Sequence, residues 1–195
     1  MKTSIINAII LVMLLGILAC KQTEKQTSFE NLPEQPLMVS KHQSVFDSSF
    51  SIFLQTYYDL SAQFYLQQAD AVNNEALLML TRADSLPFQL LKADTVIIET
   101  AQQNVANIKA ELVGMAGEQS MQEKLKGFAA ISQSLYDLIR TVQYSKTTVY
   151  HFHCSSVFNN VGADWLSESR IVKNPYLPAL NMKCGNLLDS LHFSH

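Results

Sequence analysis

The chain has 195 residues, of which 48% are apolar and 16% charged, and its 14 Lys and Arg against 17 Asp and Glu give a formal net charge of -3. This composition is not that of a disordered chain, and six Gly with five Pro exclude a fibrous or low-complexity protein. The weakly acidic balance contains no basic block, so we expect no nucleic-acid partner. Three Cys are too few for a disulfide scaffold, so their positions matter more than their number.

Residues 1–19 are predicted to be a signal peptide. Lys2 precedes an apolar stretch from Ile5 to Leu18, and 14 of these 19 residues are apolar. As a helix, residues 5–19 would reach only about 22 Å at 1.5 Å per residue, which is short of the ~30 Å hydrocarbon core of a bilayer. A cleaved signal peptide therefore fits better than a permanent membrane span.

The predicted cleavage site carries a Cys. Ile17-Leu18-Ala19-Cys20 resembles a bacterial lipobox, in which a signal peptidase cuts before a Cys that is linked to diacylglycerol. Acyl chains contribute ~0.8 kcal/mol per buried methylene, so several of them would hold the protein on membrane lipid. The alternative is an ordinary secretory signal with Cys20 just beyond its cleavage site. We expect a lipidated Cys20 and a flexible polar tether over residues 20–43. The domain would then be anchored in the cell envelope, with the outer membrane as the expected site, and face the periplasm or the cell surface.

Beyond the tether, the spacing of apolar residues predicts four helices. Their expected ranges are Ser44 to Gln68, Asp70 to just before Pro87, Asp94 to Met115, and Ser120 to Val142. Asp70 is expected to cap the second helix, and Ser120 with Glu123 forms a capping box at the start of the fourth. Gly117 is expected to end the third helix.

The first predicted helix carries an aromatic stripe on one face. Its members follow steps of three and four residues: Phe46, Phe50, Phe53, Tyr57, Leu60 and Phe64. Because no polar group lies among the rings, the stripe indicates packing in a core and not a cofactor or ligand box.

These helices predict an all-α fold, an antiparallel four-helix bundle over residues 44–145 within a domain of residues 44–195. Residues 146–190 are expected to form an irregular C-terminal lobe that contains a short strand and loops. The strand is predicted within Thr147 to Ser156, where alternation places His151 and His153 on one side and Cys154 on the other.

The lobe also carries an ordered series of short motifs that resembles a known family. The matching segments are His153-Cys154-Ser155-Ser156, Gly162-Ala163-Asp164-Trp165-Leu166-Ser167, Ile171, Asn174-Pro175-Tyr176 and Cys184-Gly185. In this order and spacing they resemble the DUF3347 domain, over about residues 50 to 188. The residues that the resemblance marks as its structural motif are Gly162, Trp165, Asn174, Pro175, Tyr176 and Gly185.

The DUF3347 domain is an extracytoplasmic module of Bacteroidetes and related bacteria. It occurs as small lipoproteins and as an appendage to periplasmic adaptor subunits of heavy-metal efflux systems. The resemblance therefore implies a helical bundle, a link to metal handling, above all of copper, and metal-efflux or other envelope proteins as partners.

The chain departs from the family pattern at two positions. The Pro-Met after the first family Cys is Ser155-Ser156 here, and the later family Met falls on Asn181, which leaves Met182 one place out of register. Because thioether sulfur favours soft Cu(I), both departures weaken a site specific for copper.

Two interpretations of Cys154 and Cys184 stay open. As metal ligands, with His151, His153 and Met182, they would hold Cu(I) or Zn(II). Strand geometry argues against a site that uses every one of these neighbours, because His153 and Cys154 point to opposite faces. As a disulfide, they would close a 30-residue loop and stabilise the lobe by about 3 to 4 kcal/mol.

We find no pattern of residues that indicates catalysis. Cys154 and His153 resemble a nucleophile and base only in composition, because neighbours on a strand do not readily meet. The expectation is a non-enzymatic, membrane-anchored lipoprotein that binds or delivers a soft metal ion, copper or zinc, in envelope metal homeostasis or efflux. The alternative is a structural or interaction lipoprotein with a Cys154–Cys184 disulfide and an envelope protein as its partner.

Overall fold

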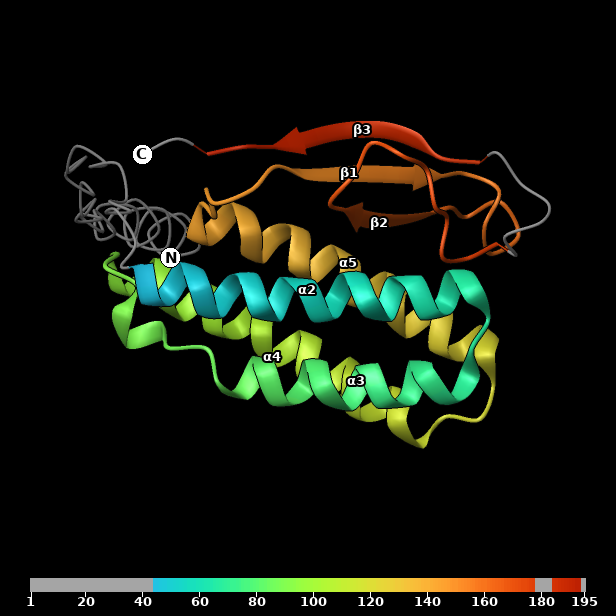
Figure 1. Cartoon of the computed structure of the whole chain (residues 1–195), viewed down its shortest axis with the longest axis horizontal. Coiled ribbons are helices and arrows are strands. Elements are labelled where there is room, and N and C mark those ends of the chain that lie inside the picture. Colours follow the sequence, from blue (N-terminus) through green and yellow to red (C-terminus); the bar gives the residue numbers. More distant parts are fainter. Residues whose placement is uncertain (1–43, 178–183, 194–195) are drawn as a thin grey trace, which may run out of the picture. The chain divides into compact units, whose positions relative to one another are not determined.

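The computed structural model describes residues 44–177 and 184–193 (Figure 1). The predictions for the signal peptide (1–19), for Cys20, for the tether (20–43) and for Met182 lie outside the described residues. Within the described ranges, no helix combines the length and the apolar character that a membrane crossing requires.

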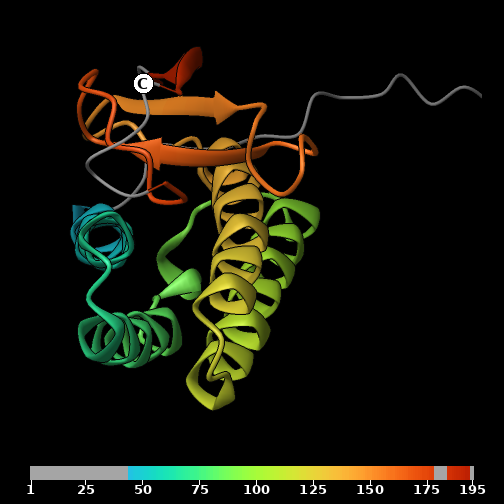
Figure 2. The same ribbon diagram turned by 90° about the vertical axis from the view of Figure 1, so that its right-hand side faces the viewer.

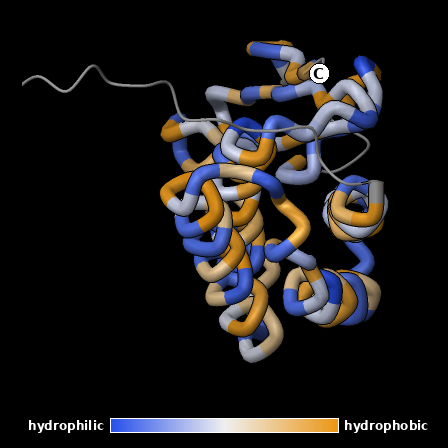
Figure 3. The backbone as a smooth tube through the Cα atoms, turned by 90° about the vertical axis from the view of Figure 1, so that its left-hand side faces the viewer, coloured by the Kyte–Doolittle hydropathy of each residue, from blue (hydrophilic) through white to orange (hydrophobic). Residues whose placement is uncertain are grey.

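The four predicted helices are present. Their bounds are Ser44–Leu66 (α2), Ala69–Asp84 (α3), Thr95–Gly117 (α4) and Met121–Val142 (α5), and a short 3-10 helix, Phe88–Leu90 (η2), precedes α4. Apolar and polar positions alternate along the helices in Figure 3, as expected of helices that bury one face.

The helix ends match the predictions in part. The third helix does end at Gly117. The prediction for Asp70 is wrong: this residue lies within the first turn of α3, and Gln68 is the N-cap residue, without a side-chain cap. One half of the capping box is confirmed, because Ser120 Oγ accepts a hydrogen bond from Glu123 N at 3.4 Å. The other half is replaced, since Ser120 N donates to Glu118 Oε1 at 2.6 Å.

The aromatic stripe of α2 forms the centre of the core. All six of its residues are at most 3% exposed. The Tyr57 ring stacks on Phe128 of α5 with 5.1 Å between centroids, and Phe50 lies 5.0 Å from the ring of Tyr144. The expected core packing is therefore confirmed, and the stripe joins α2 to α5 and to the segment that follows α5.

The C-terminal lobe contains the strand predicted within Thr147 to Ser156, and two further strands pair with it in an antiparallel sheet, which corrects the all-α prediction. The strands are Val149–Cys154 (β1), Ala163–Ser167 (β2) and Asn186–Leu191 (β3), in the order β2-β1-β3. The protein is thus mostly helical with a small antiparallel sheet. In Figures 1 and 2, β2 lies nearest the helices and β3 lies on the far side of the sheet.

A buried chain of hydrogen bonds attaches β2 to the helices. Leu166 N donates to the Tyr57 hydroxyl at 3.0 Å, and that hydroxyl lies 2.7 Å from Ser132 Oγ. Ser132 Oγ in turn donates to Phe128 O at 2.8 Å. Among the described residues, β2 is an edge strand on this side, so the Tyr57 hydroxyl accepts a bond from a backbone N–H that the sheet leaves unpaired.

Candidate functional site

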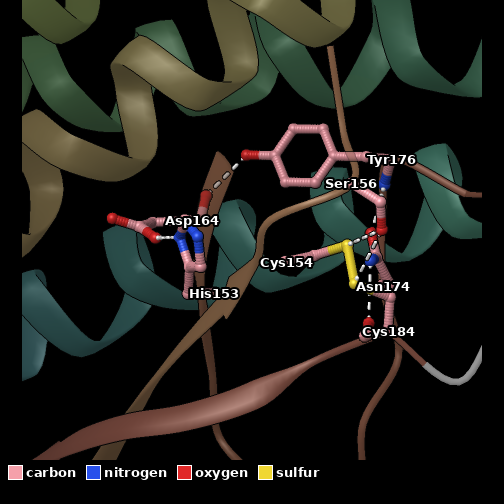
Figure 4. The surroundings of a disulfide bond; sticks show 7 residues. All are labelled: His153, Cys154, Ser156, Asp164, Asn174, Tyr176 and Cys184. Atoms are coloured by element: carbon pink, nitrogen blue, oxygen red, sulfur yellow. Dashed lines mark hydrogen bonds and ion pairs between the residues drawn. A yellow bond between two sulfur atoms is a disulfide. The ribbon is translucent and has the colours of Figure 1, made fainter. Parts of the chain in front are cut away.

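Cys154 and Cys184 form a disulfide in the structure. Their sulfurs are 2.03 Å apart and their Cα atoms 5.4 Å apart, so the bond joins the end of β1 to the segment just before β3 (Figure 4). Cys154 is fully buried, whereas Cys184 is partly exposed. Ser156 lies against both sulfurs, with its Oγ 3.5 Å from Cys154 Sγ and donating to Cys184 Sγ at 3.3 Å. Of the two interpretations of the pair, the structure therefore contains the disulfide.

The Asn-Pro-Tyr motif holds the loop around this disulfide. Asn174 Nδ2 donates to Cys184 O at 2.9 Å, and Asn174 Oδ1 accepts a bond from Tyr176 N at 2.9 Å. The Tyr176 hydroxyl donates to Asp164 O at 2.6 Å (Figure 4). Pro175, which lies between Asn174 and Tyr176 in the sequence, is buried. The motif thus connects the disulfide, the loop and β2.

The two glycines of the resemblance occupy places where a side chain does not fit. Gly162 has a φ of +88°, and a Cβ there would lie 2.7 Å from His153 Cε1. A Cβ at Gly185 would lie 2.5 Å from Val172 Cγ1 and 3.0 Å from Trp165 Cη2. Both glycines therefore permit close packing inside the lobe.

The lone Trp packs inside the lobe. Trp165 is 1% exposed, stacks on Phe152 at 5.4 Å between centroids, and meets the edge of the Tyr176 ring at 6.2 Å. These contacts place the aromatic residues of the motif around the disulfide loop.

The two predicted imidazole ligands meet a carboxylate. His153 Nδ1 donates to Asp164 Oδ1 at 2.5 Å, and His151 Nε2 lies 3.4 Å from Asp164 Oδ2. The His151 ring also packs on the ring of Tyr136 in α5, with 4.4 Å between centroids. In Figure 4 the His153 imidazole is turned towards Asp164, apart from the two sulfurs.

The predicted metal ligands are therefore divided between two places. The sulfurs of Cys154 and Cys184 are bonded to each other, and the imidazoles of His151 and His153 adjoin Asp164. Among residues 44–177 and 184–193, no group of three or more His, Cys, Asp or Glu side chains is placed to hold a metal ion. The oxidised pair does not fit a thiolate metal site, because each sulfur is engaged in the S–S bond.

Several residues that shape the site are absent from the sequence-based prediction. In the sequence, Asp164 stands out only as a motif residue, because the register that places it opposite His153 cannot be read from one chain. Ser156 departs from the pattern that the motifs resemble, and in the structure it contacts both sulfurs. The helical spacing of Tyr57 predicts a place in the core, but it gives no signal that the hydroxyl bonds to a strand over 100 residues away.

No protein-family model, no curated protein and no solved structure matches this chain.

Proposed function

We propose that the chain is a non-enzymatic, lipid-anchored protein of the cell envelope, and that its disulfide-clamped C-terminal lobe binds another envelope protein. The observation that carries this proposal is the Cys154–Cys184 disulfide. Disulfides form and persist in oxidising extracytoplasmic compartments. The predicted signal peptide and the segment at Cys20 that resembles a lipobox support the same compartment.

We further propose that the helices form an antiparallel four-helix bundle, which serves as the rigid support of the lobe. Successive helices pack against each other, α2 on α3, α3 on α4 and α4 on α5. The ring of helices is closed by the stack of Tyr57 on Phe128 and by the hydrogen bond between Tyr57 and Ser132. Each apolar stripe is then buried against two neighbouring helices, as bundle packing requires.

The lobe exposes several large apolar side chains, to which we assign the partner contacts. Val172 lies against Gly185, which directly precedes β3, and β3 itself is an edge strand with mostly exposed side chains. Large exposed apolar side chains of the lobe include Val161, Ile171, Val172, Leu187 and Leu188. Exposed apolar side chains of this kind are the contacts that we propose for the partner.

Intact mass of the isolated protein tests the clamp. The non-reduced protein should be two daltons lighter than the reduced protein, and it should resist alkylation until reductant is added. Equal masses, with both thiols alkylated before reduction, would contradict the proposal.

Lipidation is tested separately with Cys20→Ala. This variant should lose the acyl mass and should no longer sediment with the membrane fraction.

A site-specific photocrosslinker tests the partner surface. Placed at Leu187, it should give a crosslinked product of one defined mass in intact cells. The matched control is the exposed position Gln102 on α4, which should give none. Equal crosslinking at both positions, or none at Leu187, contradicts binding through the lobe.

Soft-metal binding by the reduced protein is a second candidate function. The specific observation in its favour is that the two Cys Cα atoms are 5.4 Å apart, so reduction leaves two thiols side by side. Thiolate sulfur selects Cu(I), which accepts low coordination numbers, and it also binds Zn(II). Competition titration of the reduced protein should show stoichiometric uptake that Cys154→Ser abolishes. Absence of uptake refutes this candidate and leaves the clamp unaffected.

A further inference from the structure

The two cysteines of the disulfide differ in their exposure to solvent. Cys154 is 0% exposed, whereas Cys184 is partly exposed. Ser156 is an exposed residue, and its hydroxyl donates to Cys184 Sγ at 3.3 Å (Figure 4). A reagent in solution therefore reaches this bond from the side of Cys184.

Thiol–disulfide exchange has a directional geometry that makes this difference matter. The attacking thiolate approaches one sulfur along the extension of the S–S bond, and the other sulfur is the leaving group. An attack on Cys154 would need a path through the interior, since this residue has no exposed surface. An attack on Cys184 comes from the side opposite Cys154, and Cys184 is the member of the pair that reaches solvent. The fold thus favours Cys184 as the attacked sulfur and Cys154 as the leaving sulfur.

The leaving sulfur acquires a negative charge in a buried place, where a charge needs a hydrogen-bond donor. Ser156 Oγ lies 3.5 Å from Cys154 Sγ. Because a disulfide sulfur carries no proton, the hydroxyl is the donor in this contact. Rotation of the hydroxyl directs its proton to Cys154 as the bond breaks, without a change in the backbone. Ser156 is therefore placed to stabilise the departing thiolate.

Contacts that do not involve the sulfurs hold the backbone at Cys184. Asn174 Nδ2 donates to Cys184 O at 2.9 Å, and Asn174 Oδ1 accepts from Tyr176 N at 2.9 Å. These bonds remain when the disulfide is opened, so they keep Cys184 close to Cys154. The bond can then close again after it has been reduced.

We propose that the Cys154–Cys184 bond is a thiol-exchange site that external thiolates open at Cys184, with Ser156 assisting. The external thiolate forms a new disulfide with Cys184 Sγ, and the electron pair of the broken bond leaves on Cys154 Sγ, which takes a proton from water. A second thiolate attacks the external sulfur and releases Cys184 as a thiolate. The two external thiols are thereby oxidised to a disulfide, and the protein disulfide is reduced to two thiols. The inference rests on the disulfide of the proposed function and adds the sulfur at which that clamp opens.

The position of the mixed disulfide tests this inference. The full chain is used after its mass has shown the bond, so failure of the clamp and failure of the exchange site are distinct results. Free thiols are alkylated, reduced glutathione is added, and the reaction is quenched with acid. Trypsin cleaves after Lys and Arg and places Cys20, Cys154 and Cys184 in three different peptides.

In the folded protein, glutathione should be found mostly on Cys184. In concentrated urea it should be found on both Cys154 and Cys184, because the difference in exposure is then lost. The same distribution in both conditions, or an excess on Cys154 in the folded protein, overturns the proposal.

Two probes distinguish the sources of the thiolate. Glutathione represents small thiols, and a thioredoxin whose second active-site Cys is replaced by Ser represents protein dithiols and retains the mixed disulfide. Adducts of both probes at Cys184 assign the site to protein partners as well as small thiols. An adduct of glutathione alone assigns it to small thiols. Adducts of neither probe with the folded protein overturn the proposal.

A serine variant tests the assistance by Ser156. Ser156→Ala should slow reduction by glutathione by about tenfold, the scale of one hydrogen bond to a charged group. The matched control is Ser155→Ala, because Ser155 is also exposed and the described structure shows no hydrogen bond from its hydroxyl to either sulfur. The control should react at the wild-type rate, and both variants must keep the wild-type circular dichroism spectrum. Equal rates in all three proteins, or faster reduction of Ser156→Ala, contradict the assistance by Ser156.

Discussion

At Gly162 the backbone and a neighbouring side chain both exclude any larger residue. Its φ of +88° strains a residue with a Cβ, and that Cβ would lie 2.7 Å from the imidazole of His153. We expect Gly162→Ala to lower the free energy of unfolding by about 1 to 3 kcal/mol, as measured by urea unfolding. Gly114 in α4 is the control, because nothing lies within 4 Å of a Cβ there. Gly114→Ala should raise stability by about 0.5 to 1 kcal/mol, and equal effects at the two sites would contradict this account.

Two adjacent tyrosines of α2 provide a matched test of the buried hydrogen bonds. The Tyr57 hydroxyl accepts from Leu166 N and bonds to Ser132, whereas the Tyr58 hydroxyl has no partner in the described residues. Tyr57→Phe should cost about 1 to 3 kcal/mol of unfolding free energy, because it leaves a buried N–H unpaired. Tyr58→Phe should be close to neutral in the same thermal or urea experiment. A silent Tyr57→Phe would show that β2 is not held by this contact.

Among the elements, α5 has the one capping side chain that the sequence predicted and the structure contains. Ser120 Oγ accepts from Glu123 N at the start of this helix, which supplies Phe128 and Ser132 to the core. Ser120→Ala should lower the free energy of unfolding by about 0.5 to 2 kcal/mol. Ser120→Asp keeps an acceptor at the same place and should restore most of the loss. If Ala and Asp behave alike, the cap contributes nothing to stability.

The helices could be predicted from the sequence because each buries one face, and a half-buried helix leaves a period in its residues. The strands β2 and β3 could not. In β2 the adjacent Trp165 and Leu166 are both about 1% exposed, so alternation disappears where both faces of a strand are covered. In β3 five successive residues are exposed, so this edge strand carries no apolar pattern either.

Residue types and their order predict which residues belong to the candidate site, but not how those residues contact one another. The sequence identified Cys154 and Cys184 as a pair, but the choice between a bond and a metal site depends on how near the sulfurs lie in space. The same holds for His151 and His153, whose placement on Asp164 follows from the register of β1 and β2. Contacts across strands are set by pairing, which a single sequence does not contain.

At the scale of the whole molecule, helices and sheet depend on the same buried contacts. Tyr57, Phe128 and Tyr176 come from α2, α5 and the lobe, and Phe128 lies 5.1 Å from Tyr57 and 5.9 Å from Tyr176 between ring centroids. The Cys154–Cys184 bond then closes the loop that carries Tyr176. We infer that the lobe and the helices unfold together, because neither can open without exposing these rings.

This shared tyrosine core predicts how stability depends on alkaline pH. Burial is the main cause that raises the pKa values of Tyr57, Tyr58 and Tyr176 above their ordinary value of 10.0. Neutral tyrosine is thus favoured in the folded state, while the unfolded chain loses its phenolic protons near pH 10. The stability contributed by each group is fully present below about pH 10 and is lost as pH rises above it, by up to about 1.4 kcal/mol per pH unit and group.

Urea unfolding between about pH 9 and pH 12 should therefore show a falling free energy of unfolding, and tyrosinate absorbance of these three residues should appear only on unfolding. Tyr176→Phe removes one titrating group and should reduce the slope above pH 10 by up to about 1.4 kcal/mol per pH unit. Because the Tyr176 hydroxyl donates to Asp164 O, this variant is also expected to be less stable at neutral pH, so the slope and not the stability itself is the test. A slope equal to that of the wild type would mean that Tyr176 titrates alike in the folded and unfolded states, and that its ring is open to water in solution.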